Sequence, residues 1–263
     1  MRQPTFFISH GGGPWPFVEE MRADFARTFE YLQRLPATLP EPPKAVVSVS
    51  GHWEQREFTV ATSARPPMVY DYYGFPEHTY HVVYPAPGSP ELAQRVRELL
   101  GAAGIACLTD PERGFDHGTF VPLAVMYPKA DIPVVSLSLR ADFSPEEHLR
   151  MGAALAPLRD EGVLIMGSGL SYHNLRMLRT PAAGPVSREF EKWLTDTVCQ
   201  EDSAVRNERL VHWTQAPLAR QAHPREDHLI PLMVVAGAAG ESRGRLDLRD
   251  EVWGVSMASY RFG

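Results

Sequence analysis

Short apolar runs alternate with longer amphipathic stretches along this chain. Residues 5–9 (TFFIS), 45–50 (AVVSVS) and 163–166 (VLIM) are short and rich in β-branched or aromatic side chains, as buried strands are. Residues 18–35 carry apolar side chains at spacings of three and four, which is typical of an amphipathic helix. The same patterns predict strands at 132–139 and 253–260, and helices at 90–103, 145–158, 187–198 and 230–236.

Strands that alternate with helices indicate βαβ units and a parallel sheet. We therefore expect residues 1–263 to form a single α/β domain, with a central, mostly parallel sheet and helices on both faces. The late strand at 253–260 could add antiparallel, which would make the sheet mixed. Residues 66–88 fit neither period and are rich in Tyr, Pro and Gly, which predicts a long ordered loop of the kind that often carries function.

Composition and charge exclude several classes of protein. The net charge of −6, without a block of Lys and Arg, argues against nucleic acid or an anionic membrane as a partner. Two cysteines, Cys107 and Cys199, are too few for a disulfide framework and fit a reduced, cytoplasmic setting. We find no signal-peptide pattern and no apolar run long enough for a membrane span. We expect a self-sufficient chain, a monomer or homodimer.

Histidines follow three of the predicted strands. His10 ends the first strand and precedes three glycines, His52 follows Ser50 by two residues, and His173 lies a few residues beyond the VLIM strand. In an open α/β sheet, ligands bind outside the carboxyl ends of the strands. Imidazole suits iron, zinc and similar metals. The pattern therefore predicts a metal site at this edge of the sheet.

Two further segments carry histidine beside carboxylates. One is DHGTFVPL, with His117, and the other is HPREDHLIPL, with His228. The separations are long, and no local metal-binding spacing such as HExxH supports the metal site. From the residues alone, His117 could equally hydrogen-bond a turn and His173 could cap a helix. The glycines after His10 lack the spacing of a nucleotide-binding loop.

Seven segments together resemble a known family. SHGGGP, SGHWE, YDYYGFPEHTYHVVYPAPG, DHGTFVPL, GSGLSYHNL, HPREDHLIPL and SMASYRFG occur in this order, from Phe6 to Phe262. They resemble the class III extradiol ring-cleavage dioxygenases, in the 4,5-DOPA extradiol dioxygenase branch. The resemblance implies one non-haem Fe(II) and cleavage of a catechol ring next to, rather than between, its two hydroxyls.

The resemblance also implies roles for individual histidines. His10, His52 and His228 match the metal ligands of the family. His173 matches a histidine near the metal that acts as an acid and base, and that contacts the metal in some members. His117 matches a histidine on the oxygen side, where it would donate a hydrogen bond to developing negative charge.

The third metal ligand and the identity of the metal stay open. Non-haem oxygenases commonly use two histidines and one carboxylate, and Glu226 and Asp227 lie within two residues of His228. A carboxylate ligand is therefore an alternative, whereas a third neutral imidazole would favour Zn(II) as well as Fe(II). Whatever the metal, we expect Tyr72 and Tyr73 to line the wall of the substrate pocket.

The expected reaction is insertion of O2 into a small catechol, DOPA-like or related, to give a muconic semialdehyde. Arg225 is expected to hold a carboxylate of the substrate through paired hydrogen bonds. A zinc-dependent hydrolase is the main alternative, with the same histidines around a metal-bound water and Glu226 or His173 as base. A metal-bearing binding protein without turnover is a third. The sequence does not distinguish one catechol from another.

Overall fold

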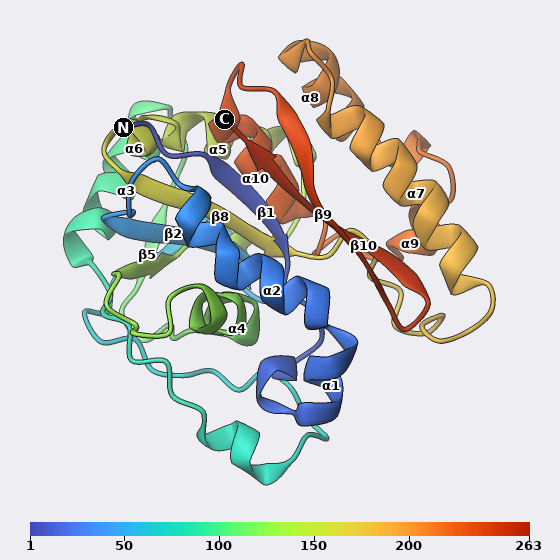
Figure 1. The fold of residues 1–263 in the computed structure, drawn as a ribbon. Helices are drawn as coiled ribbons and strands as arrows, with labels where there is room; N and C mark the ends of the chain where they lie inside the picture. Colours follow the sequence, from blue (N-terminus) through green and yellow to red (C-terminus); the bar gives the residue numbers. More distant parts are fainter.

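The computed structural model describes residues 1–263 and is built around one six-stranded sheet (Figure 1). The strand order is β6-β2-β8-β1-β10-β9. β6, β2, β8 and β1 are parallel to one another, whereas β10 runs antiparallel to both β1 and β9. The predicted α/β fold with a mostly parallel, mixed sheet is therefore confirmed. The strands are β1 (Thr5–Ser9), β2 (Ala45–Ser50), β6 (Val134–Ser136), β8 (Val163–Gly169), β9 (Gly244–Val252) and β10 (Val255–Phe262).

Helices cover both faces of the sheet (Figure 1). α10 (Ile230–Ala239) packs against β8 and β1, and α5 (Pro145–Leu155) packs on α10. α4 (His117–Met126) contacts β2 and β8, and α2 (Ala26–Arg34) packs on α4 and β9. Because α10 is buried on all sides, every one of its residues is apolar or small.

Successive residues of β8 show that α10 and α4 lie on opposite faces. A Cβ atom on Gly167 would collide with the backbone of Pro231 in α10, and one on Gly169 with the carbonyl of His228, two residues before this helix. The Ser168 hydroxyl points the other way and donates to the carbonyl of Gly118 in α4. Glycine in the central strand therefore lets α10 approach closely, at the end of the sheet where the predicted site lies.

Two buried arginines bind the backbone carbonyl groups at the C-terminal end of α10. Arg159 and Arg206 donate to carbonyls of residues 236–240 over 2.8 to 3.0 Å. These carbonyls have no partner within the helix, so the guanidinium groups satisfy them and complement the negative end of the helix dipole. The other end of α10 begins two residues after His228.

The remaining elements surround this core. β3 pairs with β7, and β4 with β5, in two small parallel sheets. None of the helices has the length and apolar character that crossing a bilayer requires. These elements are α1 (Glu19–Asp24), α3 (Pro90–Ala102), α6 (Pro157–Asp160), α7 (Ala183–Val198), α8 (Ser203–Val211), α9 (Ala219–Ala222), β3 (Glu54–Gln55), β4 (Thr59–Ala61), β5 (Leu108–Asp110), β7 (Leu139–Arg140), and 3₁₀ turns at Trp15–Phe17, Leu35–Thr38, Glu77–His81 and Trp213–Gln215.

Several predicted elements are divided in the structure. The helix predicted at 18–35 breaks at Phe25, whose ring is buried against Trp15 with 4.9 Å between centroids. The helix predicted at 145–158 divides at Ala156, before Pro157, which has no backbone N–H to donate to the preceding turn. The strand predicted at 132–139 is divided between β6 and β7, because the two parts pair with different strands.

Candidate functional site

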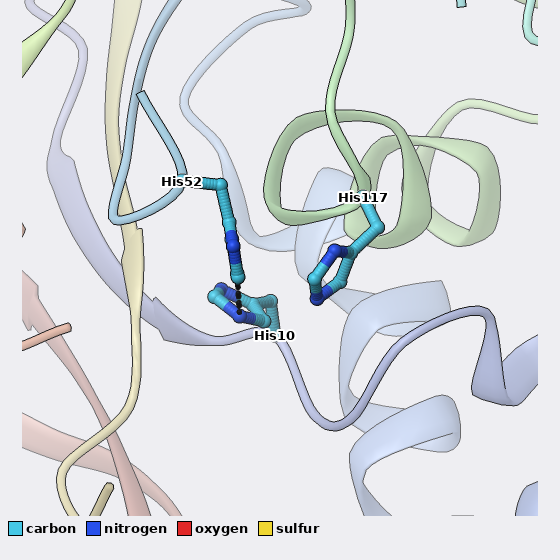
Figure 2. Close-up of side chains that lie close together, drawn as sticks. All are labelled: His10, His52 and His117. Atoms are coloured by element: carbon cyan, nitrogen blue, oxygen red, sulfur yellow. Dashed lines mark hydrogen bonds between the residues drawn. The ribbon is translucent and has the colours of Figure 1, made fainter. Parts of the chain in front are cut away.

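Three histidines from distant parts of the chain point into one space at the carboxyl edge of the sheet (Figure 2). His10 directly follows β1, His52 follows β2, and His117 is the first residue of α4. The Nε2 atoms of His10 and His52 are 3.2 Å apart, and one ring nitrogen from each of the three residues lies within 4.8 Å of the others. This group could bind a metal ion.

His228 and His173 extend the cluster on its other side. The Nε2 atom of His228 is 3.1 Å from that of His52. The ring of His173 stacks on that of His228, with 3.5 Å between centroids and 24° between planes. The structure therefore brings together all five histidines that the sequence singled out.

Oxygen atoms behind two of the rings set their orientation. Nδ1 of His10 is 2.9 Å from the hydroxyl of Ser168, and Nδ1 of His228 is 2.6 Å from Oδ2 of Asp227. An imidazole that donates its Nδ1–H to such an oxygen presents the lone pair of Nε2 on the opposite side. The Nε2 atoms of both rings are therefore prepared as acceptors or metal ligands.

Asp71 holds two further rings with one carboxylate. Its Oδ2 is 3.2 Å from Nδ1 of His52, and its Oδ1 accepts from the backbone N–H of His117 and lies 2.9 Å from the Nδ1 of that residue. Burial raises the pKa of Asp71, but the hydrogen bonds and charges of His117 and His52 outweigh burial and lower the pKa to about 2. Asp71 is therefore ionised throughout the physiological range.

The sequence did not identify Asp71. Its only signal was an acidic residue inside the tyrosine-rich loop, and its partners are far away along the chain. Ser168 was missed for the same reason, since it is one of several small residues at the end of β8.

The donor set fits a transition-metal ion. Burial, together with the neighbouring imidazoles, lowers the pKa of His10 and His228 well below the ordinary value, and lowers that of His52 to about 3. The rings are thus neutral and present lone pairs to one another at 3.1 to 3.2 Å. Such contacts are repulsive unless a cation lies among them, and neutral imidazoles suit iron and zinc.

The two carboxylates next to His228 face different ways. Glu226 forms an ion pair with Arg220, away from the histidines. Asp227 lies within the cluster, where its Oδ2 atom contacts Nδ1 of His228 and is 3.9 Å from Nδ1 of His173. Asp227 is thus placed to orient these two rings.

A cavity of about 400 Å³ lies over the histidine cluster, and aromatic side chains form part of its wall. Tyr72 is buried in its wall and donates from its hydroxyl to the carbonyl of Thr79. Tyr73 also lines it, although the side chain is 90% exposed. Its other non-histidine lining residues are Gly11, Gly12, Gly13, Met21, Asp71, Phe75, Leu170, Leu175 and Trp253.

Two of the glycines after His10 are required by the turn that they form. Gly11 has a φ angle of +81°, and a Cβ atom there would lie 2.5 Å from the Trp15 ring. Gly13 has a φ angle of +55°, and a Cβ atom there would lie 2.6 Å from Phe75. Only glycine combines this backbone with so little space. The chain can therefore turn back beneath the cavity directly after His10.

Arg225 lies beside the cavity rather than in its wall. Both of its terminal nitrogens bond the carboxylate of Glu54. The residue lines a second, neighbouring cavity of about 580 Å³, which shares His173 and Leu175 with the first.

The fold and this cluster define an α/β protein whose histidines, at the carboxyl edge of the sheet, could bind a metal ion. Residues 4–262 match the family model described as the catalytic LigB subunit of aromatic ring-opening dioxygenase. The chain belongs to this family of ring-opening enzymes, and the resemblance seen in the sequence is confirmed.

Relatives and a solved structure agree with this assignment. A 4,5-DOPA dioxygenase extradiol from Beta vulgaris is 38% identical over 98% of this chain and 96% of its own length. A protein of the same name from Escherichia coli is 37% identical over 98% of this chain and 92% of its own. The crystal structure of an uncharacterized Escherichia coli K12 protein superimposes with a TM-score of 0.80 over the whole of both chains, at 33% identity.

We predict that Asp71→Asn weakens metal binding by about 10- to 100-fold, because the neutral amide holds His52 and His117 less firmly. Competition with a chelator for Fe(II) and Zn(II) measures the affinity. Asp196→Asn, an exposed position on α7, is the matched control. Equal affinities for the two variants would show that Asp71 does not support the metal site.

Proposed function

We propose that this chain is an extradiol dioxygenase that inserts O2 into a small catechol and releases a muconic semialdehyde. The observation that carries the proposal is the set of neutral imidazole nitrogens at the floor of an aromatic-walled cavity. A cavity of about 400 Å³ suits a substrate with one aromatic ring. The names of the relatives support this reaction class.

We assign His10, His52 and His228 as the ligands of Fe(II). The Nε2 atom of His52 lies 3.2 Å from that of His10 and 3.1 Å from that of His228, and each Nδ1 has its own oxygen partner. Zn(II) would fit the same donors. When bound, iron would hold the catechol oxygens and mediate electron transfer from the ring to O2, which otherwise reacts slowly with it.

His173 is assigned as the base that takes a proton from a catechol hydroxyl. It lines the cavity, and burial lowers its pKa, which keeps the ring neutral and able to accept a proton. Asp227, 3.9 Å from its Nδ1, would stabilise the imidazolium that results. The same proton can later return to the developing product.

His117 is assigned to the oxygen side of the site. Its Nδ1 atom faces the Asp71 carboxylate, so its Nε2 atom stays free to contact a molecule in the cavity that His117 lines. Once protonated, the ring donates one N–H to Asp71 and the other to negative charge that develops during the reaction. The carboxylate holds the ring in this orientation throughout.

The substrate is expected to lie against Tyr72 and Tyr73. Because the hydroxyl of Tyr72 is bound to Thr79, Tyr72 would offer the ring an apolar face rather than a hydrogen bond. A longer substrate that reaches the neighbouring cavity would bind Arg225 through a carboxylate. That carboxylate would replace Glu54 as the partner of the guanidinium group.

Oxygen uptake tests the proposed reaction. Protein loaded anaerobically with Fe(II) should consume O2 with at least one member of a panel of catechols and form a yellow product, whereas the Zn(II)-loaded protein should consume none. Absence of uptake across the panel, in protein shown to retain its iron, would overturn the proposal and favour hydrolysable substrates.

His173→Phe should reduce turnover by about 10²- to 10⁴-fold, since it removes the base. Phenylalanine preserves the ring that stacks on His228, so the iron content should match that of the unmutated protein. Metal analysis together with oxygen uptake provides both values. If the variant loses its iron, His173 is a ligand instead.

Substitutions of Arg225 and of Glu54 should have opposite effects on the binding of acidic catechols. Arg225→Gln should raise the KM for catechols that carry a carboxylate, and Glu54→Gln should lower it by freeing Arg225, each on the order of tenfold. Neutral catechols are the control and should respond much less to either change. Equal responses of acidic and neutral catechols would remove Arg225 from the substrate site.

A further inference from the structure

A small second pocket lies behind the turn that follows His10. It has a volume of about 30 Å³ and is walled mainly by Leu170, Tyr172, Leu178, Trp253 and Met257. We call it the side pocket. It adjoins the cavity over the histidines, because Leu170, Trp253 and the backbone of residues 11–12 line both.

The wall of the side pocket is tied to two of the assigned ligands. The backbone N–H of Leu170 donates to the carbonyl of His228 over 3.0 Å. The N–H of His10 donates to the carbonyl of Gly169, the residue before Leu170, over 3.1 Å. The side pocket therefore has a fixed position next to the metal site.

The polar side-chain groups of the wall are already engaged, with one exception. The indole N–H of Trp253 donates to Asp24, and the side-chain amide of Asn174, at the edge of the pocket, bonds backbone groups on both sides. The buried hydroxyl of Tyr172 alone has no hydrogen-bond partner in the protein.

These walls favour a small apolar occupant over water. A buried water ordinarily makes two to four hydrogen bonds, and the side chains of the side pocket, most of them apolar, offer it one free polar group. Apolar cavities in proteins stay dry and bind small apolar molecules such as noble gases. The volume has room for about one molecule of this size.

We propose that the side pocket is a binding site for dioxygen, from which O2 reaches the histidine cluster separately from the catechol. This inference rests on the proposed function, since it supplies the second substrate of that reaction. The catechol would enter through the open mouth beside Tyr73, and would then block that mouth. A separate apolar pocket behind His10 keeps oxygen available to the closed site.

Krypton, a noble gas close to dioxygen in size, tests occupancy without any turnover. Crystals of the full chain pressurised with krypton should show its density in the side pocket. Leu178→Phe should remove that density, because Leu178 lines the side pocket and not the main cavity. Leu99→Phe, on the half-buried face of α3, is the matched control and should retain it.

Steady-state kinetics test the role of the side pocket. Leu178→Phe should raise the KM for oxygen by about threefold or more, with a smaller change in the KM for catechol. Absence of krypton from the unmutated protein, or an unchanged KM for oxygen in a folded Leu178→Phe variant, would overturn the inference. Krypton binding in an iron-loaded protein that consumes no oxygen would overturn the proposed function instead.

Discussion

The site depends on hydrogen bonds that lie on the far side of each imidazole ring. Ser168, Asp227 and Asp71 each face an Nδ1 atom, and these contacts turn the Nε2 lone pairs toward one point. Without them the rings could rotate or change tautomer, and the Nε2 atoms of His10 and His228 would not remain 3.2 and 3.1 Å from that of His52. A metal ion would remove the repulsion that this arrangement creates.

The fold makes this convergence possible by bringing backbones unusually close together. A Cβ atom on Gly169 would collide with the carbonyl of His228, and one on Gly51 would lie 3.3 Å from the Cα of that residue. On the other face, a side chain on Gly118 would collide with Ser50 and lie 3.0 Å from His52. The glycines at the ends of β2 and β8 and at the start of α4 therefore set the distances between histidines.

The sequence predicted most of the sheet, because most of its strands are short and apolar. Thr5–Ser9 and Ala45–Ser50 have the predicted bounds, and the antiparallel strand near the end of the chain was also expected. β9 was missed because its sequence, GRLDLRDEV, is polar, as suits an edge strand that must avoid aggregation. α4 was missed because it is apolar all round and has no helical periodicity.

For the site, the sequence predicted which imidazoles would meet but not what would hold them. His10 and His52 were found because each follows a strand, which fixes its place at the edge of the sheet. Asp71 follows no strand, and the loop that carries it takes its shape from tertiary contacts, so no local pattern could reveal its partners. Arg225 was predicted from its charge alone, and charge does not show that Glu54 already binds it.

The separation of the two cavities suggests how the site could order its substrates. The aromatic cavity is open at Tyr73, whereas the side pocket is small, apolar and lies behind the His10 turn. A catechol bound over the histidines would displace water from the open cavity, and the apolar side pocket would then hold the second substrate next to the metal site. Exclusion of water at that stage protects a reactive site from side reactions. Gly11 and Gly12, which form the turn after His10, also line both the aromatic cavity and the side pocket.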